Sequence, residues 1–151
     1  MAAPSLNGIA TAAAATITAA AVTLNGRALK VYDHEPREFD YLPAALVRGP
    51  LEFRRTDPDE QERELGRDDW DLTYEVVIAS PMPAPEQGQD DANTIIEAVI
   101  YAFDGDPTLG GAAGVTEAKL TDGERTYTAE EEAQQAVFWT CRLEVMAQST
   151  Q

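Results

Sequence analysis

Residues 70–79 read WDLTYEVVIA, and this stretch decides the fold class. Its larger apolar side chains recur at every second position: Leu72, Tyr74, Val76 and Ile78. In an extended chain this period of two places them all on one face. The β-branched and aromatic content also favours a strand over a helix. We therefore predict a strand here that buries one face.

A helix is predicted further along the chain, over residues 92–103. Its apolar stripe has helical spacing and comprises Ala92, Ile95, Ile96, Val99, Ile100 and Phe103. Either Asp90 or Asp91 can cap its N-terminus, and Gly105 and Pro107 end it. The Pro-rich segment 80–90 between strand and helix is expected to be a linker, because proline cannot continue a strand.

A second, Ala-rich helix is predicted at the N-terminus, capped by Ser5 and stopped by Asn25-Gly26. Its apolar face comprises Leu6, Ile9, Ala13, Ile17, Ala20 and Leu24. Small side chains let another backbone approach closely, so this helix can pack on its own sheet or on a neighbouring subunit. The candidate subunit-packing residues are Ala13, Ala14, Ile17, Ala20 and Ala21.

Further strands are predicted on both sides of these elements. Residues 28–34 form one, and residues 44–55 form another with a bulge or edge position at Gly49-Pro50. The inward set of the latter is expected to be Ala45, Val47, Leu51 and Phe53. After a Gly-rich loop at 104–114, a short strand over 115–120 turns at Asp122-Gly123 into residues 125–127. The last strand covers residues 137–147.

Strands and helices do not alternate regularly, so a parallel doubly wound sheet is not expected. The order predicts one α+β domain over residues 1–151. We expect a mostly antiparallel mixed sheet of about five strands, with two helices packed on one face. The polar segment 56–69 lacks apolar periodicity and is expected to be a mobile loop or a single helical turn. It carries seven carboxylates: Asp57, Asp59, Glu60, Glu62, Glu64, Asp68 and Asp69.

The composition excludes several classes of function. The 151 residues carry a formal net charge of −16, which argues against specific nucleic-acid binding and against anionic membranes. A single Cys and a single His exclude disulfide frameworks and Cys- or His-cluster metal sites. The uncharged residues 1–26 lack the basic start of a signal peptide and the length of strongly apolar sequence that a membrane span needs.

The sequence does not fit the motifs for phosphate binding, calcium binding or nucleophilic catalysis. A phosphate-binding loop starting at Gly105 would need Lys at position 111, which is Gly. Calcium loops starting at Asp57 or Asp104 lack the required Gly at the sixth position. His34 could pair with Cys141, but Cys141 falls on the apolar face of a predicted strand. We therefore expect no catalytic residue, cofactor or metal.

The layout resembles the tail terminator proteins of long, non-contractile-tailed bacteriophages. The resemblance covers most of the chain and is one of element order and texture. It lies in the Ala-rich first helix and in VYDHEP (31–36), LPAALV (42–47), WDLTYEVVI (70–78), DANTIIEAVIYAF (91–103) and VFWTCRLEV (137–145).

This resemblance implies a structural virion protein of the tail–neck region, assembled in the bacterial cytoplasm. Family members form a homo-oligomeric, hexameric ring that caps the tail tube and stops its polymerisation. The ring then joins the tail to the head–tail connector proteins, and DNA passes through its centre. The implied partners are therefore the tail tube protein and the connector proteins. The acidic segment 56–69 is the candidate for the channel side or the tube-facing side.

Three alternatives stay open at this point. The chain can be another neck protein, such as a head-closure or adaptor protein, because these are also small, acidic and oligomeric. It can be a small acidic binding module of a bacterium, with or without a divalent cation. An enzyme ranks last, and its candidate carboxylates would be Glu35, Asp104 and Asp106.

Overall fold

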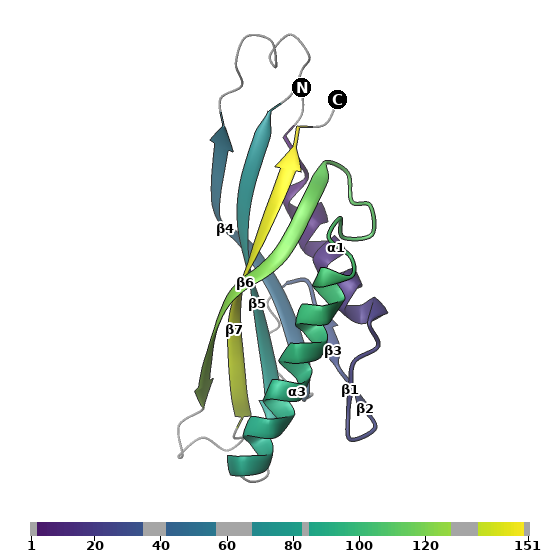
Figure 1. The fold of residues 1–151 in the computed structure, drawn as a ribbon, viewed down its shortest axis with the longest axis vertical. Coiled ribbons are helices and arrows are strands. Elements are labelled where there is room, and N and C mark those ends of the chain that lie inside the picture. The colour runs from purple at the N-terminus through teal and green to yellow at the C-terminus, as the bar shows by residue number, and fades with distance from the viewer. Residues whose placement is uncertain (1–2, 35–41, 57–67, 83–84, 128–135, 150–151) are drawn as a thin grey trace.

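A five-stranded mixed sheet with two helices on one of its faces forms the fold, which confirms the predicted α+β class (Figure 1). The computed structural model describes residues 3–34, 42–56, 68–82, 85–127 and 136–149. The strand order is β3-β4-β5-β7-β6, with only β3 and β4 parallel. The bounds are β3 (Lys30–Tyr32), β4 (Ala44–Thr56), β5 (Asp69–Pro81), β6 (Val115–Tyr127) and β7 (Ala136–Gln148).

The strand predicted first, β5, lies inside the sheet and is paired along its whole length with β7. Its alternating side chains are buried as expected, since Leu72, Tyr74, Val76 and Ile78 are at most 1% exposed. They face the two helices, α1 (Leu6–Ala19) and α3 (Pro85–Asp104). They belong to the same core cluster as Ile95, Ile96, Val99 and Phe103 of the α3 stripe. The main core therefore lies between the sheet and the helices.

The N-terminal helix begins as predicted but ends earlier. The Ser5 side chain caps it by accepting a hydrogen bond from the Gly8 backbone N–H at 3.2 Å. The predicted stop at Asn25-Gly26 is wrong, because these residues turn a two-stranded hairpin of β1 (Thr23–Leu24) and β2 (Arg27–Ala28). Asn25 and Gly26 have φ of 52° and 79°, the left-handed geometry of a tight hairpin turn.

The predicted start of α3 is also wrong. The helix begins at Pro85, so the linker predicted over 80–90 is shorter, and Asp90 and Asp91 lie inside the helix instead of capping it. Proline suits the first helical turn, because its missing N–H would have no partner there and its φ is already helical. The prediction treated the prolines only as breakers of a strand.

Strand β4 has the predicted irregularity, since its register with β5 shifts between Arg48 and Glu52, around Gly49-Pro50. Ala45 and Val47 are buried as expected, but the prediction for Leu51 and Phe53 is wrong. These two side chains are 60% and 62% exposed. Beyond the bulge, the C-terminal half of β4 lies apart from both helices, so neither helix covers it (Figure 1).

The other strand boundaries differ from the prediction at three places. Residues 28–34 are divided between β2 and the three-residue β3. The turn predicted at Asp122-Gly123 is absent and β6 continues to Tyr127, because Gly123 does not take the positive φ that such a turn requires. Strands β4 and β5 also extend into the segment predicted as a loop over 56–69, up to Thr56 and from Asp69.

Candidate interaction surfaces

The sheet face that points away from the helices is called the outer face below. One part of it carries opposed charges, whereas another part is apolar and buried, at Ala44, Leu46, Val77 and Ala79. One row crosses four strands, because the sheet register places Arg48 beside Glu75, Glu75 beside Arg142, and Arg142 beside Asp122. Neighbours opposed in this way lie close enough to interact. Arg48 donates from Nε to a Glu75 carboxylate oxygen at 2.7 Å. These four side chains therefore neutralise part of the charge of the outer face, and their charged groups keep the face solvated.

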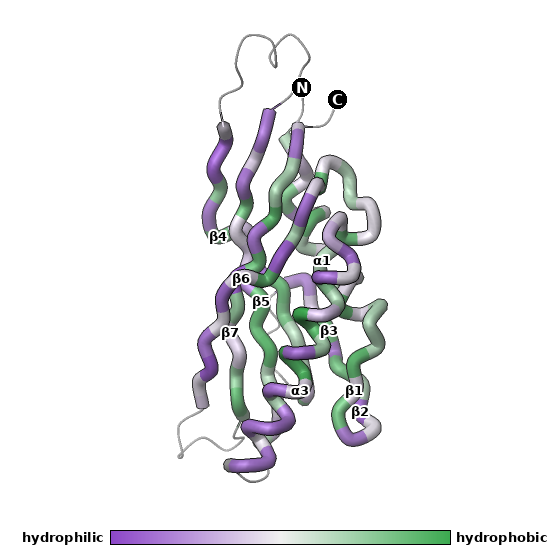
Figure 2. The backbone as a smooth tube through the Cα atoms, viewed as in Figure 1, coloured by the Kyte–Doolittle hydropathy of each residue, from purple (hydrophilic) through white to green (hydrophobic). Residues whose placement is uncertain are grey.

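Carboxylates nevertheless exceed basic groups on the outer face. By the register, the described face carries eight acidic and five basic side chains, a difference of three negative charges. The acidic residues are Glu52, Asp69, Asp71, Glu75, Glu117, Asp122, Glu124 and Glu144, and the basic ones are Lys30, Arg48, Arg54, Lys119 and Arg142. Figure 2 shows the C-terminal half of β4 as a mainly hydrophilic stretch.

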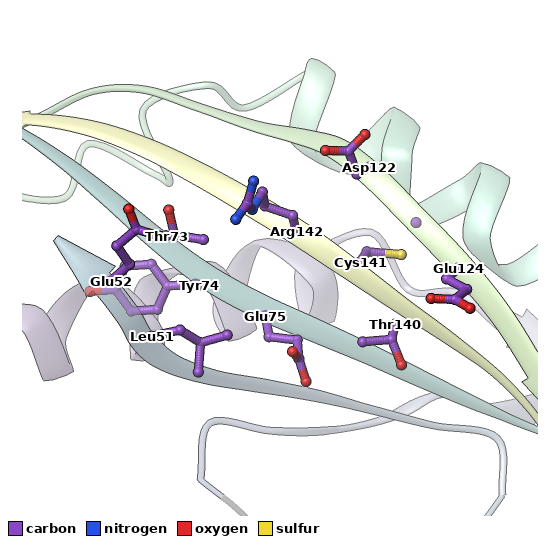
Figure 3. A pocket seen from close by; sticks show the side chains of 11 residues that line it. Leu51, Glu52, Thr73, Tyr74, Glu75, Asp122, Glu124, Thr140, Cys141 and Arg142 are labelled. Atoms are coloured by element: carbon purple, nitrogen blue, oxygen red, sulfur yellow. The ribbon is translucent and has the colours of Figure 1, made fainter. Parts of the chain in front are cut away.

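A shallow depression of about 450 Å³ lies at the centre of this face (Figure 3). Figure 3 shows Glu52, Glu75, Asp122 and Glu124 around Arg142. Because the face carries side chains of both signs, it is compatible with a docking surface for a charged partner. Burial, with a smaller contribution from Glu75, raises the pKa of the Cys141 thiol to about 11, so little of this thiol is ionised at neutral pH.

Only two of the seven predicted acidic residues lie in the described part of the chain. Asp68 is buried, 1% exposed, and accepts a hydrogen bond from Arg55 Nε at 2.9 Å. The same guanidinium lies over the Trp70 ring, 5.2 Å from its centre. Asp68 is thus a structural residue at the base of β5 and not a surface charge, which corrects its assignment to the acidic candidate set.

The other acidic candidates are placed differently. Asp69 lies in β5 and is exposed, and its carboxylate is 3.5 Å from the Gln148 amide nitrogen. Outside the described residues lie Asp57, Asp59, Glu60, Glu62 and Glu64. Their assignment to a channel-facing or tube-facing loop stays a prediction.

The predicted subunit-packing helix is largely used within its own domain. Ala13, Ala14 and Ile17 are at most 8% exposed and belong to the core between α1 and the sheet. The hydroxyl of Tyr74 fastens this helix by donating a hydrogen bond to the Leu6 carbonyl oxygen at 2.7 Å. These three residues are therefore not a free subunit contact. Ala20 and Ala21 are exposed, just beyond the last turn.

Residues considered for catalysis have structural surroundings. His34 is exposed and its Nδ1 lies 2.8 Å from the Asp33 carboxylate, whereas Cys141 is buried in the core. Asp106 accepts hydrogen bonds from the Thr16 hydroxyl at 2.9 Å and from the Gly110 backbone N–H at 2.8 Å. This carboxylate joins α1 to the loop after α3, so its environment is that of a structural tie. Glu35 lies outside the described residues.

Among the described residues, no three His, Cys, Asp or Glu side chains are grouped as metal ligands require. None of the described helices is both long and apolar enough to cross a membrane.

Two surfaces were missed by sequence reasoning. One is a small apolar groove of about 180 Å³ beside α3, β6 and β7, with Ile100 40% exposed at its rim. The other is the pair of partly unpaired strand edges on β4 and β6. Periodicity assigns Ile100 to the helix stripe but cannot show that the stripe is wider than the sheet beneath it. Edge positions depend on strand order, which the sequence does not display.

No model of a known protein family matches the chain, and no curated protein sequence matches it.

Proposed function

We propose that this chain is a ring-forming structural protein of the phage tail neck, the tail terminator. In this role it caps the tail tube, stops its polymerisation and joins the tail to the head–tail connector proteins. It acts as a virion component and not as an enzyme. The proposal rests on the resemblance in element order, and the observation that supports it best is the acid-rich part of the outer face of the sheet.

The dimensions of this face suit the wall of a passage. The four long strands each have 13 residues, which in extended conformation span about 40 Å. No described helix covers the face, and the charged groups on it, which lie apart from the buried Ala44 and Ala79, need water. An excess of carboxylates repels DNA phosphates, so DNA would slide past such a wall without adhering. In the proposed ring, the outer face lines the channel.

A ring requires contacts between two different surfaces of neighbouring copies. The first test is therefore the oligomeric state, measured by light scattering over a concentration series with negative-stain imaging of the same samples. We expect rings with the mass of six protomers, either alone or when purified tail tubes are added. A monomer at every concentration that also fails to bind tail tubes would contradict the proposal.

The channel assignment has its own test. The variant Asp71→Lys/Glu144→Lys changes two outer-face charges, and the control Glu86→Lys/Glu97→Lys makes the same change on exposed positions of α3. Both variants should form rings, and only the outer-face variant should retain DNA on the ring and lower infectivity in a complementation assay. Equal infectivity of the two variants would place the channel on another surface.

A further inference from the structure

The edge of the sheet at β6 is half occupied. At its start, the Ala118 backbone N–H donates to the Pro107 carbonyl oxygen at 2.7 Å, so the loop after α3 covers this part. From Lys119 to Tyr127, no described backbone group bonds to β6 on the side away from β7. We call residues 119–127 the β6 free edge. A strand edge of this length is a ready template for another strand.

The apolar groove borders this free edge on the helix side of the sheet. It is lined by Ile96 and Ile100 of α3, by Leu120 of β6, and by Trp139 and Cys141 of β7. The Trp139 indole N–H is buried and has no hydrogen-bond partner among the described residues. An edge strand beside a helix and an apolar groove is the arrangement in which proteins accept an extended segment, because backbone pairing supplies affinity and the groove takes a side chain.

The opposite edge of the sheet offers such a segment. Strand β3 covers β4 only at residues 44–46, so within the described chain residues 51–56 have no neighbour on that side. We call residues 51–56 the β4 free edge. Phe53 is opposite Leu72 on the helix side, yet it is 62% exposed, and Arg54 is opposite Asp71 on the outer face. This edge therefore presents an aromatic ring on one face and a positive charge on the other.

We propose that the β4 free edge of one copy adds as a strand to the β6 free edge of a second copy, with Phe53 over the apolar groove. This inference rests on the proposed ring and names the contact that closes it. In such a continuous sheet, Phe53 falls on the groove side and Arg54 on the outer face beside Asp122 and Glu124. The same pairing thus places the aromatic ring at the apolar groove and the positive charge beside the two carboxylates. Six paired residues give a contact about 20 Å long.

Two different copies are required for this contact. The β4 and β6 edges lie on opposite sides of the strand order, separated by β5 and β7, so one sheet cannot pair them with each other. Each copy then has one donor edge and one acceptor edge. A contact of this kind is heterologous and generates a ring when the rotation closes.

Engineered disulfides between copies test the contact directly. Arg54→Cys protein is mixed with Asp122→Cys or Glu124→Cys protein, and with the control Glu86→Cys on α3. The buried Cys141, whose pKa is raised to about 11, stays silent in the unmodified background. We expect mixed disulfides of Arg54→Cys with Asp122→Cys or Glu124→Cys under mild oxidation, and none with Glu86→Cys.

A pair of neighbouring substitutions tests the groove. Ile100→Glu places a charge at the groove rim, and Tyr101→Glu places the same charge next to it on a side chain that is 81% exposed. Burying a charge against Phe53 of the second copy is unfavourable. The concentration for half-assembly should rise at least about tenfold for Ile100→Glu, a change equal to about 1.4 kcal/mol. It should stay within about twofold for Tyr101→Glu. Circular dichroism checks that both variants fold.

The outcomes separate the contact from the proposed function. Rings that form without cross-links to any β6 position, or that cross-link equally to Glu86→Cys, would overturn this contact and leave the ring intact. Cross-links within a particle of two protomers would keep the contact and overturn the ring. A monomer that neither assembles nor binds tail tubes would overturn both.

Discussion

The hydrogen bonds of Asp106, which connect α1 to the loop after α3, give a quantitative prediction. Asp106 accepts one hydrogen bond from Thr16, which is 6% exposed, and a second from the Gly110 backbone. Hydrogen bonds to charged groups contribute about 1.5–3 kcal/mol each when buried. Because Asp106 is itself half-exposed, we take about 1 kcal/mol for each bond. Asp106→Ala should then lower the free energy of unfolding by about 2 kcal/mol.

The double-mutant cycle uses Thr16→Val, which keeps the side-chain shape and removes the hydroxyl. Alone, it should cost about 1 kcal/mol. Added to Asp106→Ala, it should cost almost nothing more, so the coupling energy is about 1 kcal/mol. Urea unfolding followed by circular dichroism measures all four proteins. In thermal melts, Asp106→Ala should lower Tm by about 4–8 °C at this chain length.

Additive effects would refute this reasoning. If Thr16→Val and Asp106→Ala together cost the sum of the two single changes, the hydrogen bond between them contributes nothing to stability. The variant Asp106→Asn is the matched control, because it retains an acceptor oxygen and removes the charge. It should lie between the wild type and Asp106→Ala.

Further predictions concern the core, the thiol and one carboxylate. Val99→Asp should prevent folding because it buries an unpaired charge, whereas Tyr101→Asp on the exposed side of α3 should leave the melt nearly unchanged. The Cys141 thiol, with its pKa raised to about 11, should resist a thiol reagent at pH 8 until urea unfolds the protein. Burial, then the charge of Asp90, raises the pKa of Asp91 above 3.8, so ionisation of Asp91 opposes folding. Asp91→Asn should therefore stabilise the protein at neutral pH, and the gain should disappear as the pH falls and Asp91 becomes protonated.

Elements with strong apolar periodicity were predicted well. The alternation in β5 and β7 and the stripe of α3 identified the buried faces, because one-sided burial imposes that period on the sequence. The bulge at Gly49-Pro50 was also predicted, since these residues fit poorly into a regular ladder.

Boundaries and edges were predicted less well, for physical reasons. Asp122-Gly123 has the composition of a hairpin turn, but pairing with β7 keeps Gly123 extended. Leu51 and Phe53 follow the inward pattern, yet the helices do not reach the C-terminal half of β4. Local sequence reports what a segment can bury and not whether another element is there to cover it. The same gap explains why the free edges and the groove emerged only from the structure.

The position of β7 in the sheet affects how the protein is made. It is the last of the five strands in the chain, yet it lies between β5 and β6 and pairs with both over its full length. During translation, β5 and β6 leave the ribosome before β7, the strand that pairs with both, so the nascent chain has unpaired edges and distant contacts still to form. A chain stopped before Ala136 would lack the strand that joins β6 to the rest of the sheet. Only chains translated through β7 can complete the fold, which keeps prematurely terminated products out of any assembly built from this sheet.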